Sequence, residues 1–213
     1  MTVKFIQSTF AWLIISAGFS VNTTNAGVIY SNDFESGVAE GFSNFTGVVE
    51  APNGESYIGH LIFDATSLLT LDDVSSASKI TIDFDIYGLR SLDGIDNGDN
   101  FEFFVNGESL FVDYYGHYDD ELIGPSTGEL VSHDYYTFGH GHFYGGASTY
   151  HYSVSFLNTN DTVSFGFKAN TNQGWVDEAF GIDNVVVTSV PEPSTLAILA
   201  LAVLGLASRK VKT

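Results

Sequence analysis

The chain has 213 residues, 44% of them hydrophobic, so it is long enough for one domain with a sizeable core and too apolar for wholesale disorder. It carries 26 acidic against 7 basic residues, and residues 27–190 alone hold 25 acids and three basic residues, a formal charge of −22. Such a surface repels phosphate backbones, which excludes nucleic acid as a partner. The absence of cysteine excludes disulfides, thiolate metal sites and thiol nucleophiles.

Residues 1–26 have the pattern of a secretory signal peptide. Lys4 gives a positive start, the apolar stretch 10–19 follows, and small residues lead to a cleavage point after Ala26. The alternative is an N-terminal membrane anchor, but this apolar stretch is short for a span of about 20 residues. The pattern predicts export, with signal peptidase as a processing partner.

Between residues 27 and 189 the sequence predicts short strands separated by turns. The runs that read as strands are 79–87, 101–105, 108–112, 152–156, 163–167 and 181–188. Asn106 and Gly107 stand between two of these runs, which is the strongest short-range indication of a hairpin. No part of this stretch shows a sustained 3.6-residue apolar period. We therefore expect an all-β antiparallel sandwich, with long loops in the Gly-, Tyr- and His-rich region 114–150 around a strand near 130–138.

The edges of this domain carry two short acidic motifs, Asn-Asp-Phe-Glu-Ser-Gly at 32–37 and Gly-Ile-Asp-Asn-Val at 181–185. Together with 83–87, 93–94 and 177–184, they resemble jelly-roll domains of the concanavalin A-like type, which include MAM domains and many carbohydrate-binding modules. The resemblance spans most of residues 28–188. It implies a jelly-roll β-sandwich in which the first strand lies beside an Asp-bearing last strand.

In these related jelly-rolls, acids at the first and last strands help to hold a structural calcium ion. The resemblance therefore implies that Asp33, Glu35 and Asp183 bind calcium, the one cofactor that we expect. Calcium takes six to eight oxygen ligands, and carboxylates with backbone carbonyls supply them. The alternative is that these acids are solvated groups on outward strand faces.

Two other places in the sequence offer metal ligands. Asp93, Asp96 and Asp99 lie in an oxygen-rich loop that suits calcium, although its spacing differs from that of an EF-hand. An acidic turn between two strands is the plainer interpretation. His140 and His142, with His133 and Asp134 nearby, raise the possibility of zinc, but one histidine pair in a glycine-rich loop is weak support.

Aromatic side chains give candidates for sugar binding, because flat rings suit the apolar faces of sugars and neighbouring acids accept hydrogen bonds from hydroxyls. The candidates are Tyr114, Tyr115, Tyr135, Tyr136 and Trp175, with Tyr118 and Tyr144 as further possibilities. The same rings are equally suited to packing inside a sandwich.

A catalytic set is not evident in the sequence. Asp83 and Asp85 share one face of a predicted strand, with carboxyl groups roughly 7 Å apart, a spacing that suits an inverting glycosidase. Neighbouring acids on a wet strand face are the ordinary explanation. Ser56 has the wrong spacing of flanking glycines for a nucleophile elbow. We expect a protein that is not an enzyme, and a glycan-active hydrolase that uses surface carboxylates is the alternative.

Residues 190–213 form a tail with three parts in order. Pro191, Glu192 and Pro193 end the folded domain, twelve residues without a polar side chain follow at 196–207, and Arg209 and Lys210 come next. The apolar run favours a short helix close to the lower limit for crossing a membrane, and the basic end should stay cytoplasmic.

This tail resembles the PEP-CTERM sorting signal of Gram-negative bacteria. The resemblance implies that an exosortase cleaves near Pro191–Pro193 after the helix has held the precursor in the inner membrane; the alternative is a plain C-terminal anchor. Proteins of this kind commonly accompany exopolysaccharide and biofilm production. We therefore expect an exported surface or extracellular-matrix protein with a calcium-stabilised binding or structural domain, for which exopolysaccharide is a suitable ligand.

Overall fold

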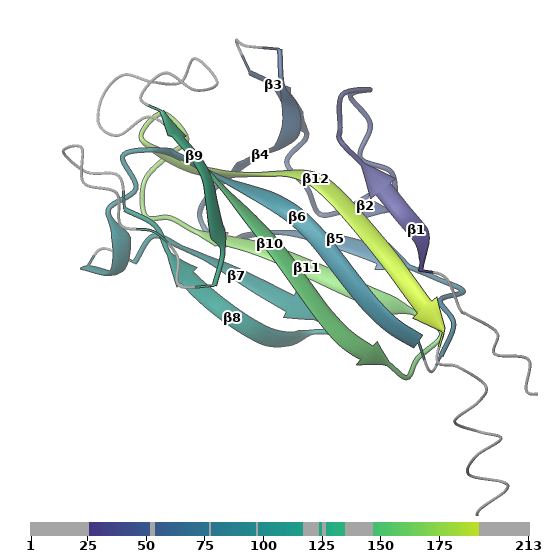
Figure 1. Cartoon of the computed structure of the whole chain (residues 1–213). Coiled ribbons are helices and arrows are strands. Elements are labelled where there is room, and N and C mark those ends of the chain that lie inside the picture. The colour runs from purple at the N-terminus through teal and green to yellow at the C-terminus, as the bar shows by residue number, and fades with distance from the viewer. Residues whose placement is uncertain are drawn as a thin grey trace, which may run out of the picture. The chain divides into compact units, whose positions relative to one another are not determined.

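The computed structural model describes residues 26–51, 54–76, 78–96, 98–116, 124, 127–134 and 147–191. One compact unit spans Thr24–Glu192. The described residues form β-strands and one 3-10 helix, η1 (Gly94–Asp96), and the strands make two antiparallel sheets packed face to face (Figure 1). The predicted signal peptide and the helix of the C-terminal tail lie outside the described residues. None of the helices within them is long and apolar enough to span a bilayer.

The first sheet has seven strands. Along it lie β3 (Val48–Glu50), β4 (Ser56–Leu61), β12 (Glu178–Pro191), β6 (Ser78–Arg90), β10 (Ala147–Asn158) and β9 (Glu129–Asp134), and β1 (Gly27–Asn32) also pairs with β12. The second sheet has five strands, in the order β2 (Phe42–Ser43), β5 (Ala65–Leu71), β11 (Val163–Asn170), β7 (Asn100–Val105) and β8 (Glu108–Tyr114).

The connectivity is that of a jelly-roll. The chain passes from β4 in the first sheet to β5 in the second, returns to β6, and crosses again at β7, β9, β11 and β12. Strands consecutive in the chain therefore lie in opposite sheets more often than they pair. The first and last strands lie side by side, with Gly27 opposite Ser189 and Asn32 opposite Val185. The all-β jelly-roll expected from the sequence is confirmed.

The core lies between the two sheets and is rich in phenylalanine. The alternation predicted for 79–87 is present in β6, where Ile80, Ile82, Phe84 and Ile86 are buried while Thr81, Asp83 and Asp85 are partly exposed. The Phe84 ring lies 4.9 Å from that of Phe103 and 5.2 Å from that of Tyr152, centroid to centroid. A second, smaller cluster that includes Tyr57, Tyr87 and Leu89 forms apart from this core.

Two strand boundaries depend on local backbone chemistry. Asn106 and Gly107 both have positive φ, 52° and 81°, as a two-residue hairpin turn between β7 and β8 requires, so that prediction is confirmed. The last strand is longer than the predicted 181–188 and continues to Pro191, opposite Ser78. A proline at the end of the strand is tolerated because the ladder needs no further N–H donor there.

Candidate functional site

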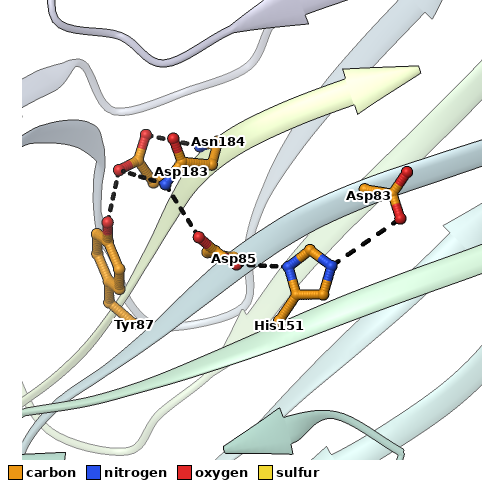
Figure 2. Close-up of polar contacts among 6 residues, drawn as sticks. All are labelled: Asp83, Asp85, Tyr87, His151, Asp183 and Asn184. Atoms are coloured by element: carbon orange, nitrogen blue, oxygen red, sulfur yellow. Dashed lines mark hydrogen bonds and ion pairs between the residues drawn. The ribbon is translucent and has the colours of Figure 1, made fainter. Parts of the chain in front are cut away.

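A chain of polar contacts crosses three strands of the seven-stranded sheet (Figure 2). Its members are Asp83, Asp85 and Tyr87 on β6, His151 on β10, and Asp183 and Asn184 on β12. The Tyr87 hydroxyl donates to Asp183 Oδ2 at 2.5 Å, and the Asn184 side chain donates to Asp85 Oδ2 at 2.9 Å. The His151 ring then contacts Asp85 Oδ1 through Nδ1 at 2.8 Å and Asp83 Oδ1 through Nε2 at 3.9 Å.

The backbone of β12 positions this chain. Its register against β6 shifts between Asp183 and Val186, and Asn184 has a φ of 52°, a left-handed conformation that asparagine tolerates. The bulge lets the Asn184 amide reach both Asp183 and Asp85. Both oxygens of Asp85 are therefore in contact with a neighbour, Oδ1 with His151 and Oδ2 with Asn184. This is a hydrogen-bond network across strands, and it leaves no oxygen of Asp85 free for acid–base catalysis.

Asp183 is buried, with 1% of its surface exposed. Burial raises the pKa of its carboxyl to about 7, against the lowering effect of hydrogen bonds from Tyr87 and the Asn184 backbone, while Asp85 and Glu55 raise it further. Burial and the adjoining Asp183 also raise the pKa of the Tyr87 hydroxyl, so this hydroxyl is the donor of the pair. Asp183 therefore binds a proton near neutral pH.

Within the described part of the chain, the three acids for which the sequence suggested calcium do not come together in one close carboxylate group. Asp33 and Glu35 lie in the turn after β1, where Asp33 Oδ1 accepts from the Glu35 backbone and Glu35 Oε1 accepts from the Ser56 backbone at 2.9 Å. Asp183 is held by Tyr87 and Asn184. Among the described residues, no three-carboxylate group includes these acids. Calcium binding by this set stays a prediction.

A different carboxylate group forms at one end of the sandwich. Asp93 precedes η1, Asp99 follows it, and Glu178 begins β12, with one oxygen of each within 4.8 Å of the others. Of the weaker predicted set, Asp93 and Asp99 thus come together, and the Asp96 side chain lies outside the described part. Burial raises the pKa of Asp99 to about 7; the Asp93 backbone N–H lowers it, and Glu178 raises it. No sequence pattern predicted that Glu178 belongs to this group.

The prediction that Tyr115 binds sugar is wrong. Tyr115 is fully buried, with its hydroxyl 2.6 Å from that of Tyr152 and its ring packed edge-on against Tyr150 and Phe180. This satisfied hydroxyl lets the ring pack inside the core, so Tyr115 offers no surface for a ligand. Tyr114 is half-buried at the end of β8.

Trp175 is 48% exposed, but its ring is already in contact with two side chains. The His60 ring stacks on it with centroids 5.0 Å apart, and the Arg90 guanidinium lies 5.5 Å from its centre. The remaining aromatic candidates, Tyr118, Tyr135, Tyr136 and Tyr144, lie outside the described residues, as do the predicted zinc ligands His140 and His142. His133 lies on β9.

The outward face of the five-stranded sheet carries an apolar surface around Phe104 that no sequence motif predicted. Leu68, Gly166 and Phe104 are direct partners on β5, β11 and β7, and so form one row across the sheet. A Cβ on Gly166 would lie 3.1–3.5 Å from three Phe104 side-chain atoms, so the Phe104 ring lies over this glycine. The row lines a depression of about 430 Å³, which we call the Phe104 face; its other lining residues are Thr66, Asn106, Gly107 and Ser164.

A scan against known families matches residues 189–211 to the PEP-CTERM protein-sorting motif. The predicted motif with Pro191, Glu192 and Pro193, the apolar run and Arg209 and Lys210 is thereby confirmed. It marks an exported protein that is processed by an exosortase and has a membrane-anchoring C-terminal tail. Comparison with curated proteins finds no match.

Among solved structures, the chain is similar to the K3 cleaved adhesin domain of Lys-gingipain from Porphyromonas gingivalis, with 11% identity and a TM-score of 0.45 over 76% of this chain and 99% of that one. It is similar to the tandem CBM22 domain of Xyn10C from Paenibacillus barcinonensis, with 13% identity and a TM-score of 0.44 over 81% and 47%. The C-terminal CBM6 of LamC, a laminarinase from Zobellia galactanivorans, gives 13% identity and a TM-score of 0.38 over 77% and 99%. At these values the likeness says nothing about the ligand.

Proposed function

We propose that this chain is an exosortase-processed surface or extracellular-matrix protein of a Gram-negative bacterium, and that its jelly-roll domain binds extracellular polysaccharide without catalysing a reaction. The sorting motif supports the export and processing. The observation that carries the binding proposal is the Phe104 ring lying over Gly166 on the outward face of a sheet.

The chemistry of the Phe104 face suits a neutral sugar. Phe104 and Leu68 form a narrow apolar row against which the C–H face of a sugar ring can stack. Hydrogen-bonding side chains flank this row, with Thr66 on one side and Ser164 and Asn106 on the other. Aromatic contact together with a few placed polar groups is the usual make-up of a small-ligand site. The charge of −22 over residues 27–190 further favours neutral glycans over polyanions.

Replacing Phe104 with alanine is expected to weaken retention on the bound polysaccharide by about tenfold, because the stacking surface is lost while the fold is kept. The measurement is affinity electrophoresis of the exported protein through gels that contain either neutral polysaccharides or exopolysaccharide from the producing cells. Phe63→Ala removes an exposed ring elsewhere and should leave retention unchanged.

Two other outcomes would overturn parts of this proposal. Loss of retention in Trp175→Ala with full retention in Phe104→Ala would move the ligand to the Trp175 surface. Release of new reducing ends from the polysaccharide, abolished by Asp83→Asn, would identify a hydrolase and contradict a role limited to binding.

Processing at both ends predicts the mass of the mature protein. Protein recovered from the producing cells should begin near Gly27 and end near Pro191, because signal peptidase and exosortase each remove one apolar segment. Intact-mass spectrometry measures both ends at once. A chain that still ends at Thr213 in cells with an active exosortase would contradict the processing.

A further inference from the structure

The carboxylate group of Asp93, Asp99 and Glu178 joins two parts of the chain that are far apart in sequence. Asp93 and Asp99 flank η1 before β7, and Glu178 is the first residue of β12. Asp99 and Glu178 have 0% exposure, and Asp93 is partly buried. The backbone N–H of Asp93 donates to Asp99 Oδ2 at 2.6 Å, so the short segment folds back on itself and turns both side chains toward Glu178.

The second oxygen of Asp99 points to a missing ligand. Asp99 Oδ1 is buried and meets no N–H or hydroxyl donor within the described part of the chain, and the neighbouring Glu178 carboxyl donates to Asp99 only when it is protonated. A buried carboxylate oxygen without a donor is costly, and buried charges in proteins are paired or coordinate a metal ion.

Two hydrogen bonds from Gln173 fix the position of the Glu178 carboxylate. The backbone N–H of Gln173 donates to Glu178 Oε2, and the Gln173 side chain donates to Oε1, both at 3.0 Å. Hydrogen bonds of this kind, from residues that do not themselves touch the metal, orient ligating carboxylates and are part of such sites. Gln173 belongs to the loop that carries Trp175, so the position of Glu178 is linked to that loop.

We propose that Asp93, Asp99 and Glu178 bind one calcium ion, which ties residues 93–99 to the start of the last strand. All three donors are carboxylate oxygens, which suit a hard cation such as calcium. Zinc favours sites that include nitrogen or sulfur ligands. Calcium accepts six to eight oxygens in flexible geometry, so three carboxylates leave room for backbone carbonyls and water. This site is distinct from the Asp33, Glu35 and Asp183 set and is independent of the polysaccharide proposal.

Calorimetric titration of calcium chloride into the exported protein, after removal of bound metal with a chelator, tests this assignment. The wild type is expected to show a calcium site whose affinity falls at least about tenfold in Asp99→Asn and in Glu178→Gln. Asp183→Asn neutralises a buried acid of the other predicted calcium set, so it distinguishes the two sets and should keep the site assigned to Asp93, Asp99 and Glu178. Magnesium at the same concentrations should bind more weakly, since it demands a stricter octahedral geometry.

Three results would overturn the proposal. Unchanged calcium affinity in Asp99→Asn and Glu178→Gln would show that these acids are not ligands. Loss of the site in Asp183→Asn alone would place the calcium on the set suggested by the sequence. Equal binding of calcium and magnesium in every variant would indicate diffuse attraction to an acidic surface. Should circular dichroism show that Asp99→Asn is unfolded, the partly exposed Asp93→Asn decides in its place.

Discussion

Replacing Phe84 with alanine is expected to lower the free energy of unfolding by about 3–5 kcal/mol, the usual cost of deleting a buried aromatic ring. Phe84 has no exposed surface and lies in the centre of the ring cluster between the two sheets. It stacks on Tyr152 and meets Phe103 and Phe167, with ring centroids 4.9–5.2 Å apart. The cavity left by this deletion touches both sheets, so local rearrangement of one strand cannot fill it.

Urea denaturation followed by tryptophan fluorescence measures this loss. Since domains of this kind are stable by about 5–15 kcal/mol, the variant should unfold at a much lower urea concentration. Phe63→Ala removes the same ring from a position that is 56% exposed, and its effect should stay within about 0.5 kcal/mol. A similar loss in both variants would mean that the packing between the sheets does not set the stability of the domain.

The parts of this fold that follow a local rule could be predicted from the sequence. Alternating side chains in 79–87 indicate a strand with one apolar face, and β6 has that face on the core. Asn106 and Gly107 favour positive φ, and they form the turn between β7 and β8. In both places the physical cause lies within a few neighbouring residues, so the sequence pattern is enough.

The candidate sites were harder to predict because each depends on residues brought together by the fold. Residues 178–183 of β12 are all buried, so no alternation marks which face Glu178 takes or that it meets Asp99. The Phe104 face needs Leu68 and Gly166 from two other strands, and the sequence shows only two consecutive phenylalanines, one facing in and one facing out. Tyr115 illustrates the reverse case, because an aromatic side chain suits a binding surface and a core equally until its hydroxyl partner, Tyr152, is known.

Lowering the pH from about 8 to about 5 is expected to stabilise the calcium-free domain, in part through Asp183. The pKa of this carboxyl is about 7 in the folded protein, against an ordinary value of 3.8, because burial disfavours its charged form. Between these values the folded chain holds a proton that the unfolded chain has released. Stability therefore rises as the pH falls through 7 and is lost again as the pH rises above it.

Thermal melts in the presence of a chelator, recorded at several pH values across this range, measure the effect. Asp183→Asn should show a smaller rise in melting temperature toward low pH, because the amide cannot titrate yet its oxygen can still accept from the Tyr87 hydroxyl. Glu108→Gln removes one acid from the exposed end of β8 and should keep the wild-type pH dependence, which separates Asp183 from the general effect of reducing a charge of −22. Identical pH dependence in Asp183→Asn and the wild type would show that Asp183 is already ionised in the folded domain, and that Tyr87 and Asn184 outweigh its burial.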